Sequence, residues 1–295
     1  MSRDGYGPIF IGGTGRSGTS VLARLLGQHS GYALISSELV FHSATRGGLP
    51  ALLSDRVTVD DFVSKMKNVW WYRERPSNKH VRVRTKGLHR VMDAPAFEAA
   101  LSRFAAEFED DRRIAARRLV RAVADPVAKR RGKPNWVEST PYNAFSGHTL
   151  ARLFPEMKLI HIVRDGRDVA VSVAGMFFGP DDVLKGLDWW ARRLESANRG
   201  TRRLRPDQLL VVQLEDLIAH DRERTYGRVL DFLEIEDDPR MRRYFDQEMQ
   251  RDKANIGRWR RDLTAEEETT VDRRYRAVLA RLRDNNVTTV PSVST

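Results

Sequence analysis

The apolar residues of this chain fall into two patterns, short uninterrupted runs and longer stretches with a helical period. Uninterrupted runs of four to six residues are typical of strands that are buried on both faces of a parallel sheet. Three such runs are strong and two are weaker. The pattern therefore predicts strands at Pro8–Gly12, Lys158–Val163 and Leu209–Leu214, with fainter ones at Asn135–Thr140 and Tyr32–Ile35.

Stretches with apolar residues three or four positions apart separate and follow these runs, and they predict helices. Strands that alternate with helices indicate an α/β fold with a central, mostly parallel sheet, helix-rich overall. Ligands of such folds bind outside the carboxyl ends of the strands. The predicted helices are Ser17–His29, Val59–Val69, Pro95–Phe108, Arg112–Ala124, Ala144–Leu153, Arg167–Met176, Asp182–Leu204, Thr225–Leu233, Asp238–Met249 and Ala265–Arg283.

Composition narrows the class of protein. The 295 residues contain no repeat and no linker-like tract, so we expect a single domain over residues 1–295. Hydrophobic residues make up 41%, which is typical of a folded globular chain. No apolar run is long enough to span a membrane and the first residues do not resemble a signal peptide, so we expect a cytoplasmic protein. The absence of cysteine excludes disulfides and thiolate metal sites.

The chain is basic, with 51 Lys and Arg against 40 Asp and Glu, a formal net charge of +11. Such an excess favours anionic partners. However, the cations alternate with acids along the predicted helices, as in 191–205, instead of forming one block. We therefore expect solvated helix faces and no nucleic-acid partner.

The sequence FIGGTGRSGTS, residues 10–20, follows the first predicted strand and opens a helix. Gly13 and Gly18 have the spacing of a phosphate-binding loop, but Thr19 stands where such a loop carries its lysine. Glycines let backbone amides approach a phosphate, and hydroxyls and a helix N-terminus add further donors. The candidate phosphate ligands are Gly15, Arg16, Ser17, Gly18, Thr19 and Ser20.

The absence of the loop lysine indicates which chemical group the protein could transfer. Magnesium-dependent phosphoryl transfer uses that lysine together with an acid at a second strand end. A sulfuryl group carries one negative charge where a phosphoryl group carries two, so it needs less neutralisation and no obligatory metal. Arg16 alone would then stabilise charge on the oxygen that bridges sulfur and phosphorus.

A second candidate anion site follows the strand at Lys158–Val163, in the sequence VRDGRDVAVS. Arg164 stands where strand becomes helix, Asp165 is a predicted N-cap, and Ser172 lies two turns further on. Positions 164, 168 and 172 share one helix face, so Arg164 and Ser172 suit a second phosphate. An ordinary ion pair of Arg164 with Asp168, with Ser172 a buried helix serine, fits the same pattern.

Both motifs resemble those of the sulfotransferases that use 3′-phosphoadenosine 5′-phosphosulfate (PAPS), which have a P-loop-like core and include bacterial members. GGTGRSGTS resembles their 5′-phosphosulfate loop, and VRDGRDVAVS resembles the motif whose arginine and serine bind the 3′-phosphate. The segment Arg251–Thr264 is similar to the basic segment that closes over the cofactor. The resemblance implies PAPS as donor, no metal, and late cofactor ligands at Lys253, Gly257, Arg258 and Trp259.

Transfer to a hydroxyl also needs a general base. The resemblance implies two candidates of nearly equal standing, Glu38 in ISSELVFHS and Glu138 in NWVESTPYNAF. Either carboxylate could instead be structural. His42 and His161 rank well below them, and we expect His161 to be a satisfied core histidine because it lies inside an apolar strand.

The acceptor is the least defined part. Aromatic and cationic residues mix at Trp70–Arg90, which suits a polar or anionic small molecule such as a sugar, and a carbohydrate, lipid or small metabolite all remain open. The oligomeric state is also open, a homodimer included. Two rival functions are a P-loop kinase with arginine in place of lysine, and a catalytically silent nucleotide-binding module.

Overall fold

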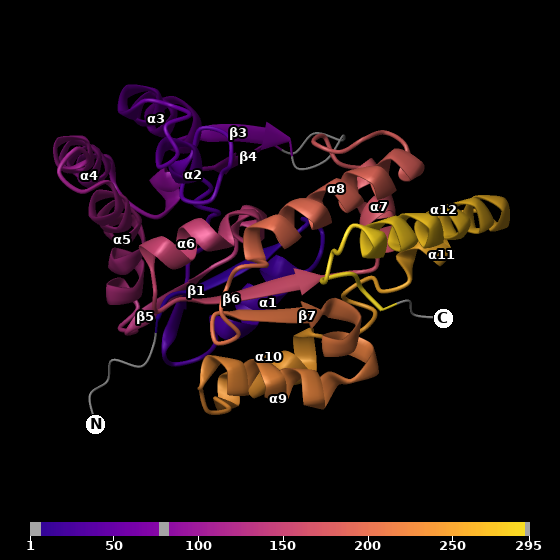
Figure 1. The fold of residues 1–295 in the computed structure, drawn as a ribbon. Coiled ribbons are helices and arrows are strands. Elements are labelled where there is room, and N and C mark those ends of the chain that lie inside the picture. The colour runs from indigo at the N-terminus through magenta and orange to yellow at the C-terminus, as the bar shows by residue number, and fades with distance from the viewer. Residues whose placement is uncertain (1–6, 77–82, 293–295) are drawn as a thin grey trace.

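A parallel five-stranded sheet forms the centre of the molecule, in the order β2-β5-β1-β6-β7 (Figure 1). The computed structural model describes residues 7–76 and 83–292. All five strands predicted from the apolar runs are present, and the α/β prediction is confirmed. The strands are β1 (Ile9–Gly13), β2 (Tyr32–Leu34), β5 (Asn135–Glu138), β6 (Lys158–Val163) and β7 (Leu209–Gln213).

The register of β1 and β6 determines where a ligand can bind. Gly13, the last residue of β1, is paired with Ile162, the penultimate residue of β6. The loop after β1 and the turn after β6 therefore leave the sheet side by side. From β1 the chain crosses to β2 and β5 on one side of the sheet, and then to β6 and β7 on the other. Ligands bind at such a switch point in open α/β sheets.

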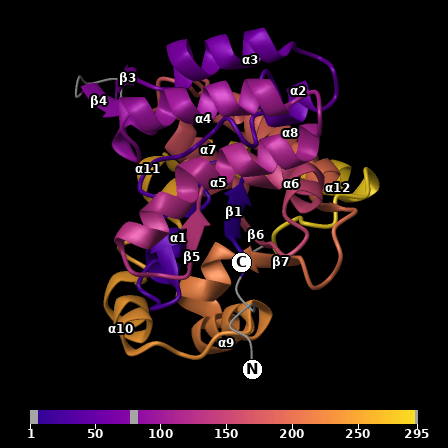
Figure 2. The ribbon, with the colours of Figure 1, turned by 90° about the vertical axis from the view of Figure 1, so that its left-hand side faces the viewer.

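Helices cover both faces of the sheet (Figure 2). Along β1 the side chains alternate: Ile9 and Ile11 pack in one hydrophobic cluster, and Phe10 packs in the cluster on the opposite face. The first cluster is closed by α1 (Thr19–Leu26), α9 (Arg222–Leu233) and α10 (Pro239–Glu248). The second is closed by α4 (Ala94–Glu107), α5 (Arg112–Arg130) and α6 (Gly147–Leu153).

A third hydrophobic cluster adjoins the end of β6. It joins α7 (Gly166–Ala174), α8 (Val183–Thr201) and α12 (Ala265–Asp284), with Trp190 and Tyr275 packed in contact at its centre. The chain end thus packs beside the turn that carries Arg164.

Several short elements were not predicted from the pattern. A two-stranded antiparallel hairpin, β3 and β4, lies outside the main sheet. Its strands are rich in arginine and lysine and lack an apolar run. The other elements that were not predicted are α2 (Leu49–Leu52), α11 (Arg258–Asp262), the 3₁₀ turn Leu88–Arg90 and the π turn Asp216–His220, and the hairpin strands are β3 (Arg73–Pro76) and β4 (Val83–Lys86). The predicted helix Val59–Val69 is present as α3 (Val59–Lys65) followed by the π turn Met66–Trp70, and the predicted helix Ala144–Leu153 as the end of the 3₁₀ turn Pro141–Ser146 followed by α6.

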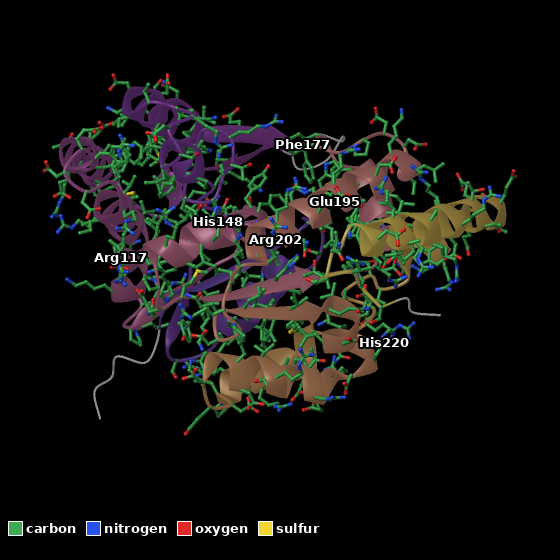
Figure 3. All side chains as sticks on the ribbon, viewed as in Figure 1. Arg117, His148, Phe177, Glu195, Arg202 and His220 are labelled. Atoms are coloured by element: carbon green, nitrogen blue, oxygen red, sulfur yellow. The ribbon has the colours of Figure 1, made fainter. Side chains whose placement is uncertain are left out.

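Charged side chains cover the outer faces of the helices (Figure 3). Many arginines are paired there with acids, such as Arg117 with Glu156 at 2.6 Å and Arg242 with Glu223 at 2.7 Å. No helix within residues 7–76 and 83–292 has both the length and the apolar character needed to cross a bilayer.

His161 lies in the middle of β6, between Gly12 of β1 and Val211 of β7. Its side chain is fully buried, as predicted. The expectation that it is satisfied was wrong, because neither ring nitrogen has a hydrogen-bond partner in the described part of the chain. Burial lowers the pKa of this imidazole to about 4.

We expect His161 to make the free energy of unfolding depend on pH. The unfolded imidazole takes up a proton near pH 6.5, whereas the folded one resists protonation down to about pH 4. Stability is therefore lost as pH falls below 6.5, by about 2 kcal/mol between pH 7 and pH 5. Urea unfolding at both pH values should show this loss in the wild type relative to His161→Leu. An equal pH dependence in the two proteins would contradict the assignment.

Candidate functional site

The loop between β1 and α1 has the backbone shape of an anion cradle. Gly15 (φ 87°), Arg16 (φ 58°) and Gly18 (φ 99°) all adopt left-handed conformations. Alternation of left- and right-handed residues gathers backbone N–H groups into a concave nest. The side-chain oxygen of Ser17 is buried without a hydrogen-bond partner, and a Cβ on Gly13 would lie 2.4 Å from it. A compact anion with oxygen acceptors fits this cradle, which is formed by the loop residues that the sequence predicted as phosphate ligands.

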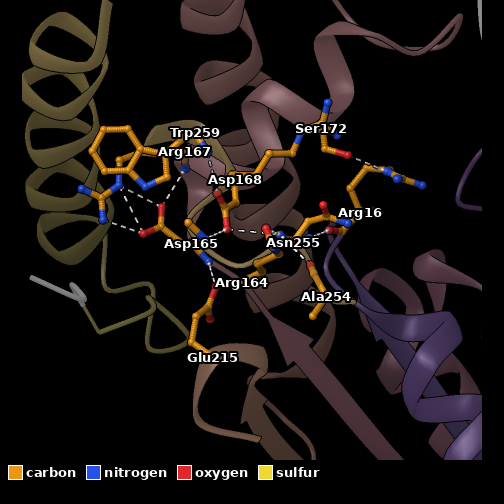
Figure 4. A network of polar contacts seen from close by, with 12 residues as sticks. Arg16, Arg164, Asp165, Arg167, Asp168, Ser172, Glu215, Ala254, Asn255 and Trp259 are labelled. Carbon is orange, nitrogen blue, oxygen red and sulfur yellow. Dashed lines mark hydrogen bonds and ion pairs between the residues drawn. The ribbon is translucent and has the colours of Figure 1, made fainter. Parts of the chain in front are cut away.

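Arg16 connects this loop to the second predicted motif. Its Nε donates to the hydroxyl of Ser172 in α7 at 2.9 Å (Figure 4). The two residues were expected to serve different phosphates, yet their side chains are in direct contact. The two candidate anion sites are therefore adjacent, and Arg16 lies between them.

Arg164, at the end of β6, is held by four oxygen acceptors. It donates to the carboxylate of Asp168 at 3.1 Å, and to the backbone carbonyls of Arg16 (3.3 Å), Ala254 (3.2 Å) and Asn255 (2.7 Å). The predicted ion pair with Asp168 is thus present. This ion pair does not prevent Arg164 from lying beside Arg16, whose side chain contacts Ser172. The Nε of Arg164 remains a buried donor without a partner in the described residues.

The same Asp168 carboxylate holds the late basic segment. It accepts the backbone N–H groups of Gly257 at 2.9 Å and Trp259 at 3.0 Å, at the start of α11 (Figure 4). A carboxylate in this position caps the first turn of the helix. The late segment is consequently fixed beside the β6–α7 turn.

Behind this turn lies a second buried polar layer. Asp165 pairs with Arg167 at 2.6 Å, and the guanidinium of Arg167 lies 4.2 Å from the ring centre of Trp259. The carboxylate of Glu215, which follows β7, accepts the N–H of Asp165 at 3.0 Å. Burial raises the pKa of Glu215 to about 7. This layer supports the turn that carries Arg164.

Of the four cofactor ligands predicted in the late basic segment, three lie at the cluster around Arg164 and one does not. Gly257 and Trp259 join the cluster through their backbones, and Arg258 is close enough to Arg16 to influence its ionisation. Lys253 is not brought in: its Nζ donates to the carbonyl of Gln247 at 2.9 Å and pairs with Glu248 at 3.1 Å.

The cluster is strongly electropositive. Burial, followed by the charges of Arg164 and Arg258, lowers the pKa of the Arg16 guanidinium. Such a shift is expected where like charges are held close together at a partly desolvated site. A bound anion would offset their repulsion, which is the electrostatic property expected of an anion site.

Glu138 is a fully buried carboxylate with every acceptor position in use. Oε1 accepts the N–H of Leu39 at 3.2 Å and the hydroxyl of Thr140 at 2.5 Å. Oε2 accepts the N–H of Thr140 at 3.0 Å and the amide of Asn143 at 2.7 Å, and lies 3.3 Å from His42. Burial opposes ionisation of Glu138, but the charge of His42 and these hydrogen bonds hold its pKa below the usual value. The geometry is that of a structural carboxylate.

Glu38 has a different setting. It is half-buried and lines a cavity of about 760 Å³ between α3, the 3₁₀ turn Pro141–Ser146 and α8. A carboxylate on a cavity wall can meet a bound hydroxyl group, which a fully enclosed one cannot. Of the two predicted bases, the geometry favours Glu38.

Arg193 of α8 is a site residue that sequence reasoning missed. Its Nε donates to the carbonyl of Thr14 in the loop, and its guanidinium lies 4.5 Å from the ring centre of Trp189 and 4.9 Å from that of Phe145. Burial lowers its pKa, partly offset by Tyr142 and Glu38. Within the sequence it is one of many arginines on a charged helix, and only the fold places it at the loop.

Comparison with known proteins agrees with these motifs. Residues 8–239 match the family model described as the sulfotransferase family. Among solved structures, the sulfotransferase domain from the curacin biosynthetic pathway is similar with a TM-score of 0.53 at 15% identity, over 96% of this chain and 99% of that one. The sulfotransferase domain from the Synechococcus PCC 7002 olefin synthase gives 0.52 at 18% identity, over 92% of this chain and 95% of that one.

We expect Asp168→Asn to destabilise the protein by about 3 kcal/mol, because an amide cannot accept from Arg164, Gly257 and Trp259 together. The control is Asp188→Asn, which removes an exposed pair with Arg274 and should cost less than about 1 kcal/mol. Urea unfolding of both variants measures the difference. Equal, small losses would show that Asp168 does not hold the late segment.

Proposed function

Because this chain belongs to the sulfotransferase family, we propose that it transfers a sulfuryl group from PAPS to a hydroxyl group of a small-molecule or carbohydrate acceptor. The observation that carries the donor assignment is the contact of Arg16 with Ser172, next to Arg164. It joins a phosphate loop to a second anion site within one cluster. A nucleotide that carries phosphate groups on both sides of its ribose suits two adjacent sites of this kind.

The residues present fit such a donor. The cradle from Gly15 to Ser20, with the unpartnered hydroxyl of Ser17, would hold the 5′ end. Ser172 and the free Nε of Arg164 would hold the 3′-phosphate, with Arg258 nearby. The late segment reaches this cluster from beyond the matched residues 8–239, which supports one sulfotransferase domain over residues 1–295.

The proposed chemistry divides between two side chains. When bound, the donor supplies an activated sulfuryl group. Arg16 would stabilise the negative charge that develops on the departing phosphate. Glu38, on the wall of the cavity, would take the proton of the acceptor hydroxyl. Glu138 would instead fix the β5 end through its hydrogen bonds to Leu39, Thr140 and Asn143.

A phosphoryl-transfer function has less support from these residues. It needs a lysine in the loop and an exposed carboxylate at a strand end for magnesium. Thr19 takes the lysine position. Glu138 is fully hydrogen-bonded, Asp165 is paired with Arg167, and Glu215 is buried with a raised pKa. The neighbouring Asp216 is half-buried and lies 3.6 Å from His220. A silent binding module would keep the nucleotide cluster but has no use for a carboxylate on the cavity wall.

We expect adenosine 3′,5′-bisphosphate to stabilise the protein without metal, by roughly 2.7 kcal/mol at a hundredfold excess over Kd. Adenosine 5′-monophosphate should bind at least tenfold more weakly, and ATP should gain nothing from magnesium. Ser172→Ala should reduce the ratio between the affinities for the bisphosphate and for the 5′-monophosphate. Substitution of Ser102, an exposed serine of α4, by alanine should leave this ratio unchanged. Thermal shift titrations measure all of these. No benefit from the 3′-phosphate would refute the donor assignment.

Substitution of Glu38 and of Glu138 should have different effects on stability and on turnover. We expect Glu38→Gln to fold normally and to lose 10²- to 10⁴-fold in turnover, measured as transfer of ³⁵S from labelled donor to hydroxyl acceptors. Glu138→Gln should lower the unfolding midpoint, since its amide group would face the donors of Thr140 and Asn143. Normal turnover of a folded Glu38→Gln enzyme would exclude Glu38 as the base.

A further inference from the structure

The cavity beside the loop carries a charge pattern that the proposed reaction does not require. It holds about 760 Å³, within the range of small-ligand sites. Trp189 of its wall lies 3.5 Å from the point where a Cβ of Gly15 would be. Arg193, also of its wall, donates to the carbonyl of Thr14. The cavity therefore adjoins the phosphate loop, where an acceptor must bind.

Cations dominate the lining of this cavity, which we call the acceptor cleft. Among the described residues of its lining, a single carboxylate, that of Glu38, stands against six basic side chains from three segments of the chain. In the described residues none of the six forms an ion pair with a carboxylate, in contrast to arginines on the outer helices such as Arg117 and Arg242. The six are Arg46, Arg56, Lys65, Arg192, Arg193 and Arg199.

Where these cations donate hydrogen bonds within the described residues, the acceptors are neutral groups. Lys65 donates to the carbonyl of Arg46 at 3.1 Å, Arg56 to the hydroxyl of Ser54 at 2.9 Å, and Arg199 to the hydroxyl of Ser196 at 2.9 Å. Neutral acceptors orient a cation without cancelling its charge. The field in the cleft is therefore positive, and it favours ligands that bring several negative charges.

Aromatic rings alternate with the cations. Trp70, Tyr142, Phe145 and Trp189 line the same cleft. The Nζ of Lys65 lies 5.4 Å from the ring centre of Trp70. Flat rings pack against the apolar faces of a ligand, while the neighbouring cations bind its anionic groups. Together they suit a ring-shaped, hydroxylated and negatively charged molecule.

The cleft continues beyond the space that one ring would fill. A second cavity of about 550 Å³ shares Thr45, Arg56, Phe145 and His148 with it. His148 lies on α6, between the helices of the N-terminal half and α8 (Figure 3). The lining of this second space mixes acids with cations: Glu109, Asp110 and Asp111 lie beside Arg112, Arg113 and Arg152. The excess of positive charge is therefore confined to the first cavity, and a longer acceptor would leave it past Phe145 and His148.

We propose that the acceptor is an acidic saccharide, one that carries carboxylate, sulfate or phosphate groups beside the hydroxyl that is modified. The proposal rests on the proposed sulfotransferase function for the identity of the reaction. Recognition of the acceptor, however, is a property of the cleft alone and can be measured without donor or turnover. The negative groups would bind Arg46, Lys65 and Arg192 while Glu38 faces the reacting hydroxyl.

The test uses a fluorescently labelled tetrasaccharide with one uronic acid per disaccharide, the same chain with its carboxylates reduced to alcohols, and an O-sulfated form of the reduced chain. Binding is measured by anisotropy at 50 and 300 mM salt. We expect both charged chains to bind at least tenfold more tightly than the neutral one at low salt, with this advantage reduced at high salt. A stronger preference for the carboxylated or the sulfated chain would identify the anionic group.

Arg46→Gln combined with Arg192→Gln tests the cleft itself. Both residues are exposed, and within the described residues neither side chain forms a hydrogen bond or an ion pair, so folding should be unaffected. The control is Arg228→Gln with Arg243→Gln, exposed residues of α9 and α10 with the same change in net charge. We expect the preference for charged chains to fall to threefold or less in the first variant only.

Equal binding of charged and neutral chains by the wild type, or an equal loss in both variants, would overturn the proposal. Failure of the sulfotransferase assignment has a separate readout, since bisphosphate binding is measured in the same proteins. If the wild type prefers adenosine 3′,5′-bisphosphate but does not prefer charged chains, the sulfotransferase assignment stands and the acidic-acceptor proposal is wrong. If it prefers charged chains but not the bisphosphate, the acceptor proposal stands and the donor assignment is wrong.

Discussion

The buried carboxylate of Asp168 is the interaction on which the arrangement of the site depends. It accepts from Arg164 at the end of β6 and from the backbone of Gly257 and Trp259, which are about 90 residues away in sequence. Without it, the backbone N–H groups at the start of α11 would lose their carboxylate acceptor, and Arg164 would lose its only acidic partner in the described residues. One carboxylate thus connects the central sheet to a segment that lies beyond the matched residues 8–239.

The same carboxylate leaves the cluster positively charged. Asp168 pairs with Arg164 and Asp262 pairs with Arg258, which leaves Arg16 without an acidic partner in the described residues. The backbone carbonyls of Arg16, Ala254 and Asn255 also hold Arg164 but add no negative charge. The lowered pKa of Arg16 shows that the fold holds these charges at a cost. Sites that are preorganised in this way bind anions without reorganising, because the opposing free energy was already spent in folding.

Much of the fold follows from the sequence because apolar runs and helical periods are local patterns. The five strands and the long helices were predictable for this reason, as was the glycine-rich loop that follows the first strand. The β3–β4 hairpin was not, since its strands are mostly charged. Nor could the sequence distinguish Glu38 from Glu138. The five donors around Glu138 include Leu39 and His42, about 100 residues away, and only the packing of β5 brings them together.

Arg193 shows how the loop and the acceptor cleft are joined. Its contact with the carbonyl of Thr14 and the contact of Arg164 with the carbonyl of Arg16 lie on either side of Gly15. Arginines from α8 and from the turn after β6 therefore fix the peptide group that precedes Gly15 and the one that follows Arg16, two left-handed residues of the loop. Transfer between two bound molecules requires their reacting atoms to be aligned within fractions of an ångström. Because Arg193 is also part of the cleft wall, the position of the loop and the shape of the cleft cannot change independently.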